Sequence, residues 1–224
     1  MNIICIYWKG DFRGRDFSGE DVHRLYQTVS KHMDRPFDFY CLTNDMESDT
    51  PGVKIPLDHP DWPGWWAKVE LHRPDLPKGR TLYLDLDIHV INNLAPILDF
   101  EGDLVMFPTK SSKRKIRTNQ DSGLIYLYQS SVMLFDPGCD VMVNLYNKFS
   151  EKPQFWISQF RSEQDMMGLW MPNQPMFPDK WLLKLASCKE IDAPKDDVII
   201  VTGQPRDTSF RNPKYTPWLE RRAR

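Results

Sequence analysis

The stretch of residues 80–91, RTLYLDLDIHVI, constrains the fold of this chain more than any other. Its alternating pattern, rich in aliphatic and aromatic side chains, predicts a β-strand. Side chains along a strand point alternately to opposite faces, so Tyr83, Asp85 and Asp87 are expected to share one face. The aliphatic residues expected on the opposite, core face are Leu82, Leu84, Leu86 and Ile88. The strand therefore predicts a sheet with a buried face and two neighbouring carboxylates on the other side.

This pair of carboxylates needs a compensating partner or solvent. Two Asp side chains two residues apart repel each other, and burying either one without a partner would cost roughly several kcal/mol. A divalent cation would offset this cost, because Mg²⁺ and Mn²⁺ prefer oxygen ligands and usually bind one or two protein carboxylates together with phosphates and water. Asp85 and Asp87 are therefore candidate metal ligands for a metal-bound diphosphate. The alternative is that both lie in solvent at the end of a strand.

Short apolar runs alternate with amphipathic segments along the rest of the chain. The expected strands are residues 2–8, 37–45, 52–58, 80–91, 103–108, 124–137 (as one or two strands) and 196–203. The expected helices are residues 21–33, 67–73 and 140–149. Residues 162–171 fit a short helix or turn, and residues 179–185 fit a short helix or strand. This alternation indicates a single α/β domain with a central, mainly parallel mixed sheet, in which ligands bind at the C-terminal ends of the strands.

Composition excludes several classes of protein. The 29 Lys and Arg residues nearly balance the 31 Asp and Glu residues, and the formal net charge of -2 excludes a chain-wide nucleic-acid-binding field. The four cysteines form no C-x-x-C pair, which argues against a zinc ribbon. No apolar run approaches the ~20 residues of a transmembrane segment, and the start lacks a signal-peptide pattern, so we expect a cytoplasmic protein.

Residues 110–117 are the local exception in charge. They contain five cations and no acid, namely Lys110, Lys113, Arg114, Lys115 and Arg117. The ordinary explanation is a solvated loop. Local charge can also dock a polyanion, so nucleic acid or another phosphate-bearing acceptor is a candidate partner through this loop.

The residues around the Asp-Leu-Asp sequence resemble a known family. The matching stretches are Trp65-Trp66-Ala67-Lys68-Val69-Glu70-Leu71, Pro74-Asp75-Leu76-Pro77, Gly79 to Asp87 and Asn93-Leu94. Together they resemble the donor-binding segment of nucleotide-sugar glycosyltransferases of the GT-A fold, in particular the glycogenin and bacterial galactosyltransferase group (glycosyltransferase family 8) and related bacterial and phage proteins. The resemblance implies a Rossmann-like GT-A domain over residues 1–206, followed by a basic, proline-containing tail over residues 207–224.

The resemblance also assigns roles to side chains. Residues implied to bind the nucleotide-sugar donor, alongside Asp85, are Tyr7, Trp8, Lys9, Lys68, Gly203 and Arg206. Residues implied to act near the sugar are Glu163, Gln164 and Asp165. Each has an ordinary structural alternative: Trp8 could pack on the following loop, Lys68 could be a surface lysine, and residues 163–165 could cap a helix.

One residue departs from the family pattern. Thr202 stands where the family carries a histidine that serves as a third metal ligand. A hydroxyl is a poorer ligand than imidazole, so this departure predicts weaker metal binding in the absence of nucleotide.

The resemblance implies a metal-dependent hexosyltransferase. It would use Mn²⁺ or Mg²⁺ to move a hexose from a nucleoside diphosphate sugar, UDP-glucose or UDP-galactose being the expected donors, to an unidentified hydroxyl such as that of a modified phage DNA base or a glycan. Retention and inversion of the anomeric centre both stay open. One alternative is a catalytically impaired nucleotide-sugar-binding protein. Another is a phosphatase of the haloacid dehalogenase type, whose nucleophile also lies in an Asp-x-Asp sequence after a strand.

Overall fold

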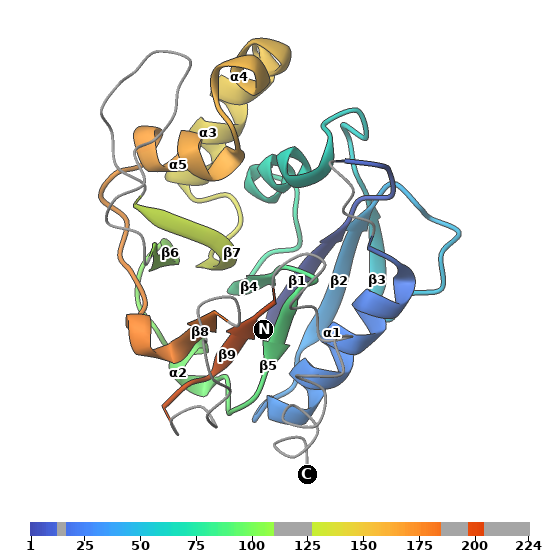
Figure 1. Ribbon diagram of the computed structural model, residues 1–224, viewed down its shortest axis with the longest axis vertical. Coiled ribbons are helices and arrows are strands. Elements are labelled where there is room, and N and C mark those ends of the chain that lie inside the picture. Colours follow the sequence, from blue (N-terminus) through green and yellow to red (C-terminus); the bar gives the residue numbers. More distant parts are fainter. Residues whose placement is uncertain (13–16, 110–126, 185–196, 204–224) are drawn as a thin grey trace.

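The central element of the fold is a six-stranded sheet (Figure 1). The computed structural model describes residues 1–12, 17–109, 127–184 and 197–203. Strand β1 (Asn2–Tyr7) lies between β2 (Asp38–Thr43) and β4 (Thr81–Leu84) and runs parallel to both. The carboxyl ends of β1 and β4 therefore meet at the same edge of the sheet, where ligands of α/β folds bind.

The strands beyond β2 and β4 complete the sheet, and those beyond β4 make it mixed. Strand β3 (Val53–Pro56) extends the parallel series beyond β2, and β7 (Tyr128–Phe135) pairs antiparallel with both β4 and β6 (Leu104–Pro108). The strand order is β3-β2-β1-β4-β7-β6. This architecture confirms the predicted α/β class with a mainly parallel mixed sheet. The segment expected over 124–137 contains a single described strand.

Helices cover both faces of the sheet. Helix α1 (Gly19–His32) begins with a capping box between Ser18 and Asp21. Its buried residues Val22, Leu25 and Val29 pack in one core with alternate residues of β1, namely Ile3, Cys5 and Tyr7. The intervening residues of β1, Ile4 and Ile6, face a second core.

The second core lies under three other helical segments. These are the 3₁₀ segment η1 (Gly64–His72), α3 (Asp140–Ser150) and α5 (Glu163–Trp170). Their largest core side chains include Trp66 of η1 and Phe149 of α3, whose rings stack with centroids 5.6 Å apart. The predicted helix over 67–73 is therefore a 3₁₀ segment that begins three residues earlier. The remaining helices are α2 (Ala95–Leu98), α4 (Pro153–Gln159) and η2 (Asp179–Trp181).

The prediction of one strand over 80–91 is wrong. The chain leaves the large sheet after β4, turns at residues 85–87, and enters a second sheet as β5 (Ile88–Val90). There β5 pairs antiparallel with β9 (Ile200–Thr202), which runs parallel to β8 (Leu182–Lys184). Asp disfavours strands, and two nearby carboxylates repel each other, so the break falls at the acidic pair. The predicted packing nevertheless holds, because Leu82, Leu84, Leu86 and Ile88 all lie in the core that contains α1.

Among the described residues, no helix has the length and apolar character needed to cross a membrane.

Candidate functional site

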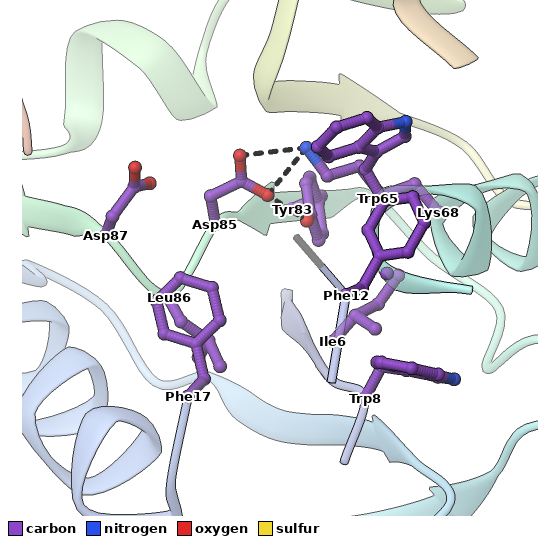
Figure 2. Close-up of a pocket in the computed structure, with 11 residues that line it drawn as sticks. Ile6, Trp8, Phe12, Phe17, Trp65, Lys68, Tyr83, Asp85, Leu86 and Asp87 are labelled. Carbon is purple, nitrogen blue, oxygen red and sulfur yellow. Dashed lines mark hydrogen bonds and ion pairs between the residues drawn. The ribbon is translucent and has the colours of Figure 1, made fainter. Parts of the chain in front are cut away.

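A pocket opens where β1 and β4 end. Its walls come from the end of β1 and the loop after it, from the start of η1, and from β4 with the acidic turn (Figure 2). The lining residues are Ile6, Trp8, Phe12, Phe17, Gly64, Trp65, Lys68, Tyr83, Asp85, Leu86 and Asp87. The pocket therefore combines an aromatic wall with one cation and two carboxylates.

The backbone of the acidic turn is fixed from the large sheet. The Asp85 amide donates to the carbonyl of Ser131 on β7 at 2.9 Å, and the Ile88 amide closes the turn by donating to the Asp85 carbonyl at 3.1 Å. The first bond extends the pairing of β4 with β7 by one residue, and the second closes the turn. They leave the carboxylates of Asp85 and Asp87 on the pocket wall.

Two further contacts hold the turn from outside the large sheet. Arg24 of α1 donates from Nη2 to the Leu86 carbonyl at 2.6 Å. The Gly203 amide, just past β9, donates to the Asp87 carbonyl at 2.8 Å. The turn is therefore held by three segments that are far apart in the sequence, β7, α1 and the residue after β9.

Asp85 carries most of the polar contacts in the pocket. Lys68 Nζ lies 2.8 Å from each carboxylate oxygen of Asp85, and the hydroxyl of Tyr83 donates to Oδ1. Figure 2 shows Asp85 turned toward Lys68, with Asp87 on the far side of Asp85. Burial alone would lower the pKa of Lys68, but the charges of Asp85 and Glu163 outweigh it and raise that pKa. Lys68 is therefore a charged ammonium that lines the pocket.

Helix α5 adds a second carboxylate behind Lys68. Glu163 Oε1 lies 3.5 Å from Lys68 Nζ and accepts a hydrogen bond from Ser130 Oγ at 2.6 Å. The neighbouring Gln164 accepts from the Ser130 amide at 3.0 Å. Burial raises the pKa of Glu163, against the opposing effects of Lys68 and Ser130. The start of α5 is thus tied to β7 and to Lys68.

Asp165 is placed differently from Glu163 and Gln164. Its side chain belongs to a fully buried residue, and its amide donates to Ser162 Oγ at 3.4 Å, so Ser162 caps α5. None of residues 163–165 is among those that line the described pocket. Of residues 163–165, Glu163 contacts Lys68 directly, and Glu163 and Gln164 both contact Ser130 of β7.

The three residues predicted to meet the nucleoside diverge at the end of β1. Trp8 lines the pocket, and its indole N–H donates to the Pro60 carbonyl at 2.9 Å. Tyr7 is buried in the core with α1. Lys9 is largely exposed and forms an ion pair with Asp45 at 2.8 Å. The described structure therefore brings only Trp8 of this group to the pocket wall.

Two aromatic wall residues were not foreseen. Phe12 and Phe17 both line the pocket, and the ring of Phe12 packs edge-on against Trp65 with centroids 4.7 Å apart. They lie in a polar, glycine-rich stretch whose pattern predicts only a loop. Two aromatic residues in such a loop were the available signal that it covers an apolar surface.

The C-terminal part of the described chain returns to the acidic turn. Thr202 pairs with Ile88 in the small sheet, next to Asp87, and Gly203 binds the Asp87 carbonyl. The backbone therefore brings Thr202 and Gly203 next to the acidic turn. Arg206, the basic segment 110–117 and the boundary of the tail 207–224 lie outside the described residues.

The donor set suits a divalent cation with few protein ligands. Asp85 and Asp87 supply carboxylate oxygens at the pocket wall, which are the ligands that Mg²⁺ and Mn²⁺ prefer. No group of three or more His, Cys, Asp and Glu residues in the described part of the chain could hold a metal ion. The residues present therefore fit a cation that takes its remaining ligands from phosphate and water.

Comparisons with known proteins identify the fold. The structure of a galactosyltransferase, LgtC, in complex with donor and acceptor sugar analogs matches with a TM-score of 0.64 and 15% sequence identity, over 100% of this chain and 94% of that one. The apo-form glycosyltransferase GlyE of Streptococcus pneumoniae matches with a TM-score of 0.63 and 13% identity, over 99% of this chain and 60% of that one. No family model and no curated protein matches the chain.

The chain therefore has the GT-A-like fold of these glycosyltransferases, as the resemblance implied. The identities are low, so the likeness establishes the fold, and the activity has to be argued from the site. This fold gives the phosphatase alternative no support.

Proposed function

We propose that this protein is a glycosyltransferase that moves a hexose from a nucleoside diphosphate sugar to a hydroxyl acceptor with the help of Mn²⁺ or Mg²⁺. The observation that carries the proposal is the position of Asp85 and Asp87, on one turn at the carboxyl end of β4, in a pocket shared with Lys68. In the transfer, the bond between the anomeric carbon and the diphosphate oxygen breaks, a bond between the anomeric carbon and the acceptor oxygen forms, and the proton of the acceptor hydroxyl passes to the departing nucleoside diphosphate or to water.

Asp85 and Asp87 would hold the cation. Bound there, the cation would act as a Lewis acid on the leaving diphosphate. Lys68 adds a positive charge to the same wall and would meet the negative charge that develops on the diphosphate. Glu163, which accepts a hydrogen bond from Ser130, lies 3.5 Å from the Lys68 ammonium.

The aromatic wall supports a nucleoside on the donor. Trp8, Phe12, Phe17 and Trp65 give the pocket flat apolar surface beside the charged groups. A nucleobase can stack on such surface while its phosphates face Lys68 and the carboxylates. Uridine diphosphate sugars, with glucose or galactose, are the donors that we propose to test first.

The acceptor is proposed at a coarser level. Hydroxyls of a glycan or of a modified DNA base are the candidates, and the second depends on the basic segment 110–117, which lies outside the described residues. Transfer to DNA with hydroxymethylated bases, assayed against plain DNA and against oligosaccharides, separates the two.

The test of the proposed function is calorimetry of UDP binding with and without Mn²⁺, followed by hydrolysis and transfer assays with a panel of nucleotide sugars. We expect Mn²⁺-dependent UDP binding and slow donor hydrolysis in the absence of acceptor. A chain that binds no UDP in the presence of Mn²⁺ would contradict the proposal.

A specific observation also favours a second candidate, a nucleotide-sugar-binding protein without transfer activity. Thr202 replaces a histidine ligand of the family, and Lys68 engages the Asp85 carboxylate. Mn²⁺-dependent UDP binding without hydrolysis or transfer from any donor would select this candidate over the enzyme.

A further inference from the structure

Lys68 contacts both carboxylate oxygens of Asp85, the residue proposed to ligate the cation. Its ammonium lies 2.8 Å from both carboxylate oxygens of Asp85, and 3.5 Å from Glu163 Oε1. The Lys68 side chain is only 12% exposed, so little water screens these contacts. In this arrangement the Asp85 carboxylate already has a cation.

A divalent cation and this ammonium exclude each other at Asp85. A metal ligated by a carboxylate lies roughly 2.0–2.2 Å from the ligating oxygen, and both oxygens of Asp85 already have Lys68 Nζ at 2.8 Å. Like charges at such short range repel strongly in a poorly hydrated site. Lys68 therefore has to leave Asp85 before that carboxylate can ligate a metal.

Glu163 offers a second anion to which the ammonium of Lys68 can shift. Its carboxylate is within reach of the ammonium, is 3% exposed, and is held from behind by Ser130 Oγ. Removing a buried ammonium from its only anion costs several kcal/mol, but transfer to a second anion avoids most of this cost. A donor diphosphate in the pocket would supply further negative charge on the same side.

We propose that Lys68 is an exchangeable counter-ion of Asp85, which shifts to Glu163 and to the donor diphosphate when Asp85 ligates the divalent cation. Cation and donor then bind as a coupled pair, because each favours the position of Lys68 that admits the other. The coupling is reciprocal, so the donor raises the affinity for the cation by the same factor as the reverse. The inference rests on the proposed function for the identity of the donor.

The test is a titration with Mn²⁺, followed by electron paramagnetic resonance of the free ion, with and without UDP. For the unchanged protein we expect weak Mn²⁺ binding that UDP tightens by about ten-fold or more. Lys68→Met should bind Mn²⁺ without UDP about ten-fold more tightly than the unchanged protein, and UDP should tighten Mn²⁺ binding by a smaller factor than it does in the unchanged protein. Lys180→Met is the matched control, because Lys180 is an exposed lysine paired with Asp197 outside the pocket.

A second variant guards against a misfolded Lys68→Met. Glu163→Gln keeps Lys68 but removes the charge of its second partner, so Lys68 should stay on Asp85. We expect this variant to lose about five-fold or more of the tightening of Mn²⁺ by UDP. Thermal melting of each variant shows that it is folded under the conditions of the titration.

The outcomes separate the two proposals. If UDP binds with Mn²⁺ but Lys68→Met leaves Mn²⁺ binding without UDP unchanged or weaker, the counter-ion role is wrong and the proposed function stands. If the unchanged protein binds no UDP at all, the proposed function and the coupling both fall.

Discussion

Two carboxylates beside the same 3₁₀ segment, η1, are bound in opposite ways. Glu70, within η1, is fully buried and accepts hydrogen bonds from the amides of Asp58 and His59, at 2.8 and 2.6 Å, and from Arg73 at 3.0 Å. Asp85 faces the pocket, and its carboxylate is bound by the side chains of Lys68 and Tyr83.

The difference separates a structural carboxylate from an exchangeable one. Backbone amides cannot move away without unfolding the loop that carries them, so the partners of Glu70 are permanent. The long side chain of Lys68 can rotate and choose among anions at modest cost. A close contact between an acid and a base therefore anchors a loop at Glu70 and forms part of the candidate ligand site at Asp85.

The largest expected effect is loss of function without loss of stability, at Asp85. Asp85→Asn removes a charged ligand oxygen, so we expect donor hydrolysis and transfer to fall by about a hundred-fold or more. The melting temperature should change little, because Lys68 keeps Glu163 as a second anion and the turn is held by its backbone. Rates and melting curves measured beside Asp99→Asn, an exposed acid paired with Arg35, check this expectation. Full activity of Asp85→Asn would contradict the proposed role of Asp85 as a ligand of the cation.

At Glu70 we expect the reverse pattern. Glu70→Gln leaves Arg73 buried with a weakened partner, so the free energy of unfolding should fall by about 3 kcal/mol. Urea unfolding measures it, and the matched control is Asp75→Asn, which removes a contact to the same Arg73 from an exposed residue. The control should cost less than about 1 kcal/mol. Equal losses in the two variants would remove the distinction between buried and exposed partners.

His72, at the end of η1, should make stability depend on pH. It is 1% exposed, and burial lowers its pKa to about 3. The unfolded chain binds a proton near its ordinary pKa and the folded chain does not, so stability is fully present above about pH 6.5 and falls as the pH is lowered toward the folded pKa.

The loss attributable to His72 should reach about 2 kcal/mol at pH 5. Melting temperatures from pH 7.5 to 4.5 measure it, and His72→Leu should flatten the curve. His23→Gln, which changes an exposed histidine, should leave the curve unchanged. A curve of the same slope in His72→Leu would assign the acid sensitivity to other groups.

The smallest effect is expected at Arg24, whose side chain contacts the backbone of the acidic turn. Arg24 holds the Leu86 carbonyl between the two candidate ligands, so Arg24→Met should loosen the turn. We expect the affinity for UDP with Mn²⁺ to weaken by about ten-fold, in the range seen when groups behind metal ligands are removed. Calorimetry beside Arg35→Met, a surface variant, tests this. Unchanged affinity with reduced stability would show that Arg24 supports only the fold.

Much of the fold could be predicted from the sequence because local patterns determine it. The run at residues 2–8 gave β1, and the apolar face of residues 21–33 gave α1, since both bury side chains with a regular period. The break after Leu84 could not be predicted in the same way. The apolar alternation continues through Leu86 and Ile88, which still pack in one core although the chain changes sheets.

The site was predictable where a short sequence carries its chemistry, and hidden where it depends on distant contacts. Asp85 and Asp87 were predicted as a pair of carboxylates on one face of a strand over residues 80–91. The pairing of Lys68 with Asp85 and Glu163 depends on how η1, β4 and α5 pack, which no local pattern encodes. Phe12 and Phe17 were hidden for the same reason, because only the fold brings their loop over the pocket.

The most direct test of the account is a crystal structure with Mn²⁺ and UDP, using anomalous scattering to locate manganese. We expect an anomalous peak between the carboxylates of Asp85 and Asp87, with the UDP diphosphate among its ligands and Lys68 Nζ displaced from Asp85. Bound UDP with Lys68 still on Asp85, and manganese absent from that turn, would contradict it.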